Sequence, residues 1–423
     1  MMYRDHGLIL FVSSLLSSCD TASSWSLSRG GRPVQDKLDR RDFFANVGLV
    51  TAGIMCGQLS QPEWAYAMEQ PSGLPASFEM YNIIPDASET LNPKLVKVDN
   101  FELVDMLANS KIGRAIWLGE HHNSLNDHNF QEQFIRILHQ RRQVVGEEAR
   151  PMAIGLEQVQ IRFQDVLDEY VKGNISLEEM RRRVDWDKRW MWNFEGYSGI
   201  FKAARELGNV RLLALNVDSE DLTMVEKGGY QGLPMEQLRK YIKDPVGFGA
   251  FAKTTSFKTY VDYVISPSYD MHQRLGLLKY TIAGEKMDED MSFRNFLSGR
   301  ILWDEGMASA AYTWMLENQG GLLVGLVGAD HVKFANGIPA RFSRLSDGKF
   351  DSTTMVINPT LIDSRPSGSV SNIPGADSSK TPDMITLQLR YLKDDVDPTN
   401  PELRVLPENT GGVLSFADYI VVT

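Results

Sequence analysis

Four short runs of apolar residues stand out along the chain, and a polar residue or polar cluster follows each of them directly. The runs are Ala115–Leu118, Ala153–Leu156, Val210–Leu215 and Leu322–Val327. Continuous apolar runs of this length are typical of strands that are buried on both faces of a parallel sheet. The pattern therefore predicts four buried parallel strands, each with polar groups at its carboxyl end.

Between these runs, apolar residues recur at the spacing of one helical face. The segments with this spacing are Asp127–Arg142, Val159–Lys172 and Gly199–Leu207. In the first of them Phe130, Phe134 and Leu138 repeat every fourth residue, which predicts an amphipathic helix. Strands that alternate with helices indicate an α/β fold, with a central, mostly parallel sheet flanked by helices.

The second half of the chain departs from this alternation in three places. Residues 219–293 are rich in Tyr, Met, Lys and Gly and carry weak helical patterns, which predicts a mostly helical insertion that covers the sheet edge. Residues 364–382 are rich in Ser, Pro, Gly and Asp and predict a linker. The strand-like runs Met384–Leu392 and Val413–Val422 predict a small β appendage over 383–423, or an added edge of the sheet.

Residues 1–67 have the pattern of a targeting segment. The apolar stretch Gly7–Leu16 follows Arg4 and is too short to span a membrane as a helix, which is typical of a signal peptide. A twin-arginine motif, Arg40-Arg41, then precedes a mildly apolar stretch that ends at the A-x-A cleavage pattern Ala65–Ala67. Two export signals in series require two translocation steps.

This layout resembles the tripartite presequence of thylakoid-lumen proteins in algae with secondary plastids, in which an aromatic residue, here Trp25, opens the transit peptide. The alternative is a bacterial-type exported lipoprotein, because Leu16–Cys19 fits a lipobox, but that leaves the second signal unexplained. We expect delivery to the plastid thylakoid lumen, a mature chain that starts at Met68, and a main domain over 68–363.

The composition of the chain excludes several classes of function. The net charge of −11 argues against nucleic-acid binding, which needs a basic face. Beyond the N-terminal region no apolar run reaches the length of about 18 residues that a membrane-spanning helix needs, so we expect the mature domain not to span a membrane. Both cysteines, Cys19 and Cys56, lie in the expected presequence, which excludes disulfides and thiol catalysis from the mature protein.

The polar residues after the apolar runs predict one composite site, because ligands of α/β folds bind beyond the carboxyl ends of the strands. These residues are Glu120, His121, His122, Glu157, Asn216 and His331. His122 and His331 each lie three residues after a glycine, and their imidazoles can bind a metal ion or haem iron, or move protons. His128, before a helical segment, is placed to cap the helix or line the site.

Each of these residues also has a purely structural interpretation. A strand-end histidine can simply bond to a loop backbone, and Glu120 or Glu157 can form a salt bridge, orient a histidine, or act as acid or base. The aromatic segment Trp186–Phe194 can pack against a flat apolar ligand or belong to the core. The acidic pair Asp304-Glu305 can pair with Arg300 or face the site.

Taken in order, these motifs resemble the ChaN-like haem-binding family, which is related to the Tiki/TraB and erythromycin-esterase folds. The motifs that carry the resemblance are Leu118–Asn123, Asp127–Gln131, Gly155–Glu157, Arg211–Asn216, Leu302–Ala308, Gly328–Val332 and Gly337–Arg341. The resemblance spans about residues 100–345 and implies haem binding, often as a homodimer, with a role in haem or iron handling.

The resemblance leaves the ligands of the haem open. Tyr197, Tyr230 and the histidines all remain candidates for the axial ligand, and His121, His122, His128, Asn216 and His331 for the haem site. The related Tiki/TraB branch implies the alternative of a metal-dependent hydrolase. It would use Glu120 and Glu157 in catalysis and bind a divalent metal through His122, His331 and Glu157.

Overall fold

The computed structural model describes residues 78–85, 93–143, 150–359, 387–392 and 411–423. The expected targeting segment 1–67 and linker 364–382 lie outside the described residues. The strands are β1 (Glu79–Ile84), β2 (Lys94–Lys97), β3 (Arg114–Glu120), β4 (Met152–Gln160), β5 (Val210–Asn216), β6 (Leu322–Gly328), β7 (Asp351–Ile357), β8 (Gln388–Leu392), β9 (Gly411–Ser415) and β10 (Tyr419–Val422). In the described part of the chain, no helix is long and apolar enough to cross a membrane.

The helices connect the strands and form the insertion. They are α3 (Asn100–Ala108), α4 (Leu125–Gln143), α5 (Gln164–Val171), α6 (Leu177–Arg183), α7 (Trp186–Arg189), α8 (Phe194–Leu207), α9 (Ser219–Gly228), α10 (Met235–Tyr241), α11 (Pro245–Phe251), α12 (Thr255–Tyr260), α13 (Ser266–Arg274), α14 (Phe293–Glu317) and α15 (Ile338–Ser346). A turn of π-helix, Val261–Ile265, joins α12 to α13.

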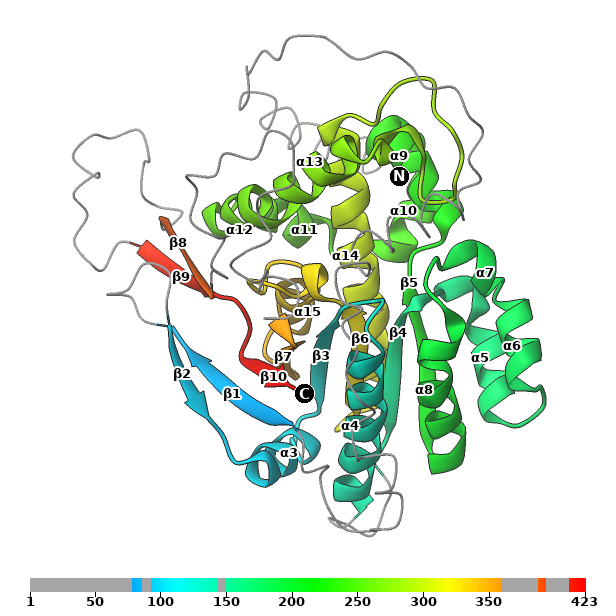
Figure 1. Cartoon of the computed structure of the whole chain (residues 1–423). Helices are drawn as coiled ribbons and strands as arrows, with labels where there is room; N and C mark the ends of the chain where they lie inside the picture. The colour runs from blue at the N-terminus through cyan, green and yellow to red at the C-terminus, as the bar shows by residue number, and fades with distance from the viewer. Residues whose placement is uncertain (1–77, 86–92, 144–149, 360–386, 393–410) are drawn as a thin grey trace, which may run out of the picture.

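The main sheet has eight strands in the order β2-β1-β10-β7-β3-β6-β4-β5 (Figure 1). All neighbours from β10 to β5 pair in parallel, and only β1 runs antiparallel to both of its neighbours. The α/β class with a mostly parallel sheet is therefore confirmed. All four predicted strands are found, and they lie side by side as β3, β6, β4 and β5.

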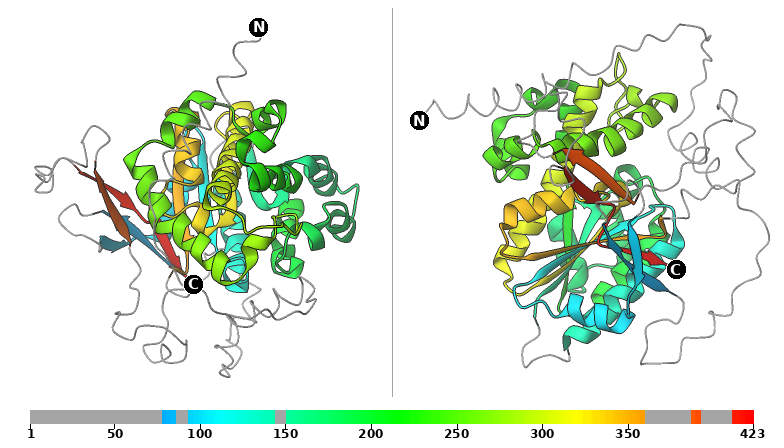
Figure 2. Two further views of the ribbon diagram at one scale, coloured as in Figure 1. Left: turned by 90° about the horizontal axis from the view of Figure 1, so that it is seen from above. Right: turned by 90° about the vertical axis from the view of Figure 1, so that its left-hand side faces the viewer.

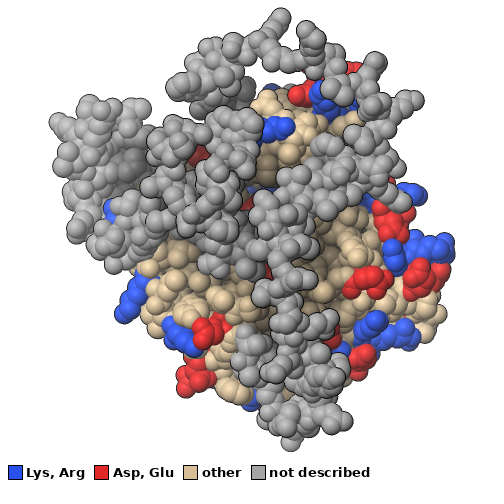
Figure 3. All heavy atoms as spheres, in the orientation of Figure 1, with Lys and Arg blue, Asp and Glu red and all other residues tan. Residues whose placement is uncertain are grey.

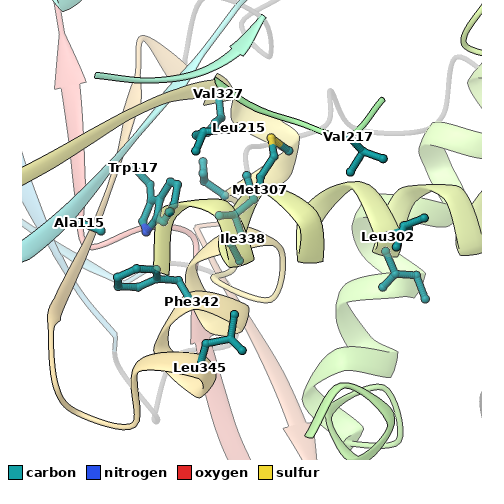
Figure 4. Packing of buried hydrophobic residues seen from close by; sticks show 14 of the residues in the cluster. Ala115, Trp117, Leu215, Val217, Leu302, Met307, Val327, Ile338, Phe342 and Leu345 are labelled. Carbon is teal, nitrogen blue, oxygen red and sulfur yellow. The ribbon is translucent and has the colours of Figure 1, made fainter. Parts of the chain in front are cut away.

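The sheet is a middle layer between two hydrophobic cores, because alternate side chains of a strand point to opposite faces. On one face Ile116 and Leu118 of β3 pack in the core that α3, α4 and α8 cover. On the other face Ala115 and Trp117 of β3 pack in the core that α14 and α15 cover. Figure 4 shows Trp117 beside Phe342 of α15, whose ring centroid lies 5.6 Å away.

A glycine makes room for this tryptophan. A Cβ atom on Gly325 of β6 would lie 2.6 Å from Cε3 of Trp117, closer than real Cβ contacts come. The absence of a side chain at position 325 therefore lets the indole pack closely against the neighbouring strand.

Several predicted boundaries were wrong. β4 continues past Leu156 to Gln160 through an irregularity in its pairing with β5, so Val159 belongs to a strand and the next α-helix begins only at Gln164. The run Val413–Val422 splits into β9 and β10. β8 and β9 form the expected small β appendage, in which the two strands are antiparallel. β10 instead lies inside the main sheet between β1 and β7, and not at its edge.

The segment 219–293 is helical, with α9 to α13 following β5 directly. In the right-hand view of Figure 2 these green helices lie beyond one end of the sheet. Because α9 begins three residues after β5 ends, that end is the one where the parallel strands have their carboxyl termini.

The face of the molecule over α5, α6 and α7 carries acidic and basic side chains side by side (Figure 3). Among them are the ion pairs Arg181–Asp187 and Arg182–Glu179. Charges of both signs alternate there instead of forming a patch of one sign.

Candidate functional site

The carboxyl ends of the four central strands bring the predicted residues to one edge of the sheet. Glu120 ends β3 and pairs in register with Gly328, which ends β6. Glu157 lies in the irregular part of β4, and Asn216 ends β5 and pairs with Gln160. A 3-10 turn, Ala329–His331, follows β6 and carries His331 back over the edge.

His331 lies between two carboxylates and is almost completely buried. Its Nδ1 bonds to Asp304 of α14, and its Nε2 lies 3.1 Å from Oε1 of Glu157. Burial and the charge of Arg300 act to lower the pKa of His331, but the two carboxylates outweigh them and raise it to about 9. Since both ring nitrogens face acceptors, the imidazole is held as a cation.

Glu157 connects three of the four strands. Its Oε2 accepts a hydrogen bond of 2.6 Å from the backbone N–H of Gly328, and its own carbonyl accepts one of 2.7 Å from Nδ2 of Asn216. Burial acts to raise the pKa of Glu157, but the charge and hydrogen bond of His331 hold it below its ordinary value. A charged carboxylate is therefore maintained beneath the sheet edge.

His122 is the predicted histidine that reaches the surface, with 22% of its side chain exposed. Its Nδ1 lies 2.8 Å from Oε1 of Glu120. The rings of Trp190 and Trp192 flank it at centroid distances of 4.9 and 5.8 Å. Burial acts to lower the pKa of His122, but the hydrogen bond to Glu120 and the charge of Glu157 raise it above its ordinary value.

The imidazole of His122 lies directly over Gly328. A Cβ atom at this position would be 2.7 Å from Nε2 of His122, so only glycine allows the ring to lie there. Gly328 therefore has two roles in the site. Its backbone N–H donates to Glu157, and its lack of a side chain leaves room for the ring of His122.

Glu120 is buried under His122 and is surrounded by donors. Besides His122, its carboxylate accepts hydrogen bonds from Tyr197, Gln131 and Gln158. Burial acts to raise the pKa of Glu120, but the hydrogen bond from His122 and the nearby ring of His128 hold it well below its usual range. Tyr197 was predicted as a candidate haem ligand and Gln131 lies in one of the family motifs, but neither was predicted to bond to Glu120. Gln158, 38 residues after Glu120, was not singled out, because its position depends on the pairing of β4 with β6.

The remaining predicted residues lie around this centre. His128 stacks on Tyr197 with ring centroids 4.0 Å apart, and its Nε2 lies 3.8 Å from Oε1 of Glu120. Both the backbone N–H and Nδ1 of His121 bond to Oδ2 of Asp127, so this histidine is held at the start of α4. Tyr230 lies in the insertion, where its hydroxyl donates to the carbonyl of Ser298.

The acidic pair Asp304-Glu305 is divided between two roles. Asp304 faces the site and holds His331. Glu305 points instead into the interface with α15, where it pairs with Arg341 and Arg344. Successive residues of a helix point in different directions, so the sequence alone could not assign which of the two carboxylates serves the site.

The predicted divalent-metal set of His122, His331 and Glu157 is not arranged for that purpose. Within the described ranges, no group of three or more His, Cys, Asp or Glu side chains is placed to hold a metal ion. The physical reason is the state of His331, because a ring nitrogen that donates to Asp304 or Glu157 has no lone pair for a metal.

The aromatic segment belongs partly to the core and partly to the site. Trp186 is buried among Phe194, Tyr197 and Phe201. Trp190 and Trp192 come from the same short segment but lie against His122. The core interpretation therefore holds for Trp186, whereas packing of Trp190 and Trp192 against a flat ligand stays a prediction.

Comparison with known proteins places this site in a family. Residues 106–342 match the model of the family described as haem-binding uptake, Tiki superfamily, ChaN. Among solved structures the chain is similar to ChaN of Campylobacter jejuni, described by its cofacial haem binding, with 14% identity, 81% of this chain and 96% of that chain covered, and a TM-score of 0.46.

Two other solved structures are similar. One is a mutant of the erythromycin esterase EreC in its open conformation, with 14% identity, 66% of this chain and 76% of that chain covered, and a TM-score of 0.34. The other is a protein of Bacillus cereus, with 12% identity, coverages of 81% and 94%, and a TM-score of 0.34. No curated protein sequence matches the chain.

Proposed function

The chain belongs to the ChaN haem-binding family of the Tiki superfamily, and from this premise we propose that it binds haem and acts in haem or iron handling. The family model covers the strands β3, β4, β5 and β6 that build the candidate site. Bound haem would supply an iron centre that accepts an imidazole or a phenolate as its axial ligand.

The observation that supports the proposal best is the state of His122. Its Nδ1 is occupied by Glu120, and its Nε2 makes no hydrogen bond with the described residues. Because Glu120 and Glu157 raise the pKa of the ring, iron would have to displace a proton from Nε2. Its side chain is partly exposed, and Trp190 and Trp192 offer apolar ring faces beside it. A ligand nitrogen backed by a carboxylate and set among aromatic rings fits a haem iron.

The other candidate ligands fit less well. His331 has both nitrogens engaged and is buried. Tyr197 is 1% exposed and donates its hydroxyl to Glu120, and Tyr230 is 5% exposed and donates to Ser298. We therefore assign the axial ligand to Nε2 of His122.

Replacing His122 with alanine tests this assignment. The variant should bind haem at least about tenfold more weakly, because the iron loses its protein ligand. Titration of the protein with haemin, followed by the Soret band, measures the dissociation constant. His272→Ala is the matched control, since this histidine lies on α13 of the insertion and bonds to the carbonyl of Ser268.

An unchanged dissociation constant in His122→Ala would contradict the assignment and move the haem to another surface, such as one shared between two copies of the chain. Sedimentation of the haem-loaded protein would then distinguish a shared surface from a site within one copy.

A hydrolase that uses Glu120, His122, Glu157 and His331 is the second candidate. The pair of His122 and Glu120 favours it, because a carboxylate-backed imidazole with an available nitrogen can remove a proton from water. Saturable hydrolysis of an ester or peptide that is lost in His122→Ala, by a protein that shows no Soret titration, would establish the hydrolase in place of the haem protein.

We also propose that the protein acts in the plastid thylakoid lumen. Arg40-Arg41 and the cleavage pattern Ala65–Ala67 support this proposal. Replacing both arginines with lysine should abolish maturation during import into isolated thylakoids, whereas the same double change at Arg29 and Arg32 should not. Normal processing after Ala67 in the double-lysine variant of the motif would exclude the twin-arginine route.

A further inference from the structure

Arg300 is a cation of α14 whose guanidinium bonds to none of the described residues around it. The residue is partly exposed, and its Nε is buried without a hydrogen-bond partner. Its two terminal nitrogens reach the surface, and they form no hydrogen bond or ion pair within the described part of the chain. A guanidinium carries five N–H donors, and a buried donor without an acceptor costs free energy. Arg300 therefore has its full set of donors available to a ligand.

Trp303 presents a second donor on the same face of α14, because residues three positions apart on a helix are neighbours. Its Nε1 is also buried without a hydrogen-bond partner among the described residues. Its indole packs against the imidazole of His331, with ring centroids 5.2 Å apart. The next residue, Asp304, bonds to Nδ1 of the same histidine. This face of α14 therefore lies against the sheet edge at which the candidate site is built.

The ordinary partner of Arg300 would be Asp304, which lies four positions further along the helix. Asp304 is drawn to His331 instead, and the two described side chains of Arg300 and Asp304 form no ion pair. The charge of Asp304 still acts on Arg300 and raises the pKa of the guanidinium. Arg300 is thus held as a cation near the site while its N–H groups stay unused.

The charges around Arg300 favour a ligand with a single negative charge. The carboxylates whose charges act on Arg300 are those of Asp304, Glu157 and Asp330. His331 already pairs with the first two, and Lys333 lies 3.0 Å from Oδ1 of Asp330. Because three negative groups are already present, a dianion such as a phosphate is repelled more strongly than a monoanion.

The shapes of the two side chains favour a carboxylate on an organic group. The planar fork of a guanidinium donates two parallel N–H bonds to the two oxygens of a carboxylate. Trp303 is partly exposed, so part of its indole is open to an apolar or aromatic ligand. An organic acid with one carboxylate therefore matches both side chains.

We propose that Arg300 and Trp303 form a subsite for a monocarboxylic acid beside His331. The terminal nitrogens of Arg300 bind the carboxylate, and the indole of Trp303 packs against the organic body and turns its N–H to one of the carboxylate oxygens. This inference goes beyond the proposed haem function and does not depend on it.

Isothermal titration calorimetry of the full chain with benzoate tests the proposal. Wild type should bind benzoate saturably, and it should bind benzamide, the neutral analogue, at least about tenfold more weakly because the charge is lost. Arg300→Gln should weaken benzoate binding by a similar factor, and Trp303→Phe by about threefold, because it keeps a ring but removes the N–H. Arg294→Gln is the matched control, since Arg294 lies six residues earlier on α14 and so on another face.

A second measurement separates ligand binding from a structural role of Arg300. Arg300→Lys keeps the charge but not the fork, so it should keep the wild-type midpoint of urea unfolding and still bind benzoate more weakly. Arg300→Gln should also keep the midpoint, because no hydrogen bond or ion pair is lost. A lower midpoint in Arg300→Gln with benzoate binding intact would show that Arg300 only balances the neighbouring carboxylates, and would overturn the inference.

The remaining outcomes also decide against the subsite. Absence of saturable benzoate binding by wild type, or equal binding of benzoate and benzamide, would exclude a carboxylate site. Tighter binding of phenyl phosphate than of benzoate would replace the carboxylate with a phosphate. A haemin affinity that falls in Arg300→Gln would place a propionate of haem at Arg300 and overturn the assignment to a monocarboxylic acid.

Discussion

Replacing Glu305 with leucine is expected to lower the free energy of unfolding by about 3 to 5 kcal/mol, the range for a buried charge that loses its partner. Glu305 and Arg341 are fully buried, and Nη1 of Arg341 lies 3.1 Å from Oε2 of Glu305. Within the described residues, Nε and Nη2 of Arg341 have no hydrogen-bond partner. The variant leaves this guanidinium buried without its counter-charge.

The surroundings of Arg341 offer no substitute for Glu305. The rings of Phe248, Phe251 and Phe257, from the insertion, lie 5.7, 5.1 and 5.4 Å from its guanidinium carbon. Ring faces attract a cation but do not replace a charged hydrogen-bond acceptor. The ion pair therefore joins α14 and α15 to the insertion, and its loss should loosen all three.

Urea unfolding of the variant measures the effect. The double variant Glu305→Leu with Arg341→Met should recover most of the lost stability, because it replaces a buried pair with apolar side chains of similar size. Glu179→Gln, at an exposed ion pair with Arg182, serves as the control and should be indistinguishable from wild type. A double variant as unstable as Glu305→Leu would show that packing, and not the unpaired charge, is responsible.

The second large effect is a loss of stability at alkaline pH through His331. Its pKa in the folded protein is about 9, above the ordinary value of 6.5. A group whose pKa is raised by folding stabilises the protein fully below its unfolded pKa, and this contribution disappears as the pH rises through the folded pKa. At about 1.36 kcal/mol per pKa unit, His331 should contribute roughly 3 kcal/mol that is lost between pH of about 6.5 and about 9.

The free energy of unfolding, measured by urea titration across this pH range, checks the prediction. Asp304→Asn should reduce the slope, because it removes one of the two carboxylates that hold the imidazolium. His331→Gln should remove the contribution of this residue altogether. A wild-type stability that stays constant across the range, or a slope unchanged in both variants, would mean that His331 is not held as a cation.

Strands β7 and β10 show where sequence patterns stop being informative. β7 begins with Asp351, Ser352 and two threonines, so no apolar run marks it, although it pairs with β3 in the middle of the sheet. β10 is only four residues long and enters the sheet between strands that are distant in sequence. Their positions depend on pairing partners, which a local pattern does not contain.

The sequence by itself determined the α/β class, the four central strands and the edge at which the site lies. It could do so because burial on both faces imposes a continuous apolar run, and because the carboxyl ends of parallel strands share one edge. The same argument predicts that Glu120, His122, Glu157, Asn216 and His331 lie near one another.

Only the tertiary structure decided what each of these residues does. His122 and His331 follow the same glycine spacing, yet His331 is enclosed between Asp304 and Glu157 while His122 keeps one nitrogen without a partner among the described residues. Their difference comes from α14, which supplies Asp304, and from α8, which places Tyr197 on Glu120. Protonation and tautomer are set by such contacts between elements far apart in the chain, and no spacing along the chain encodes them.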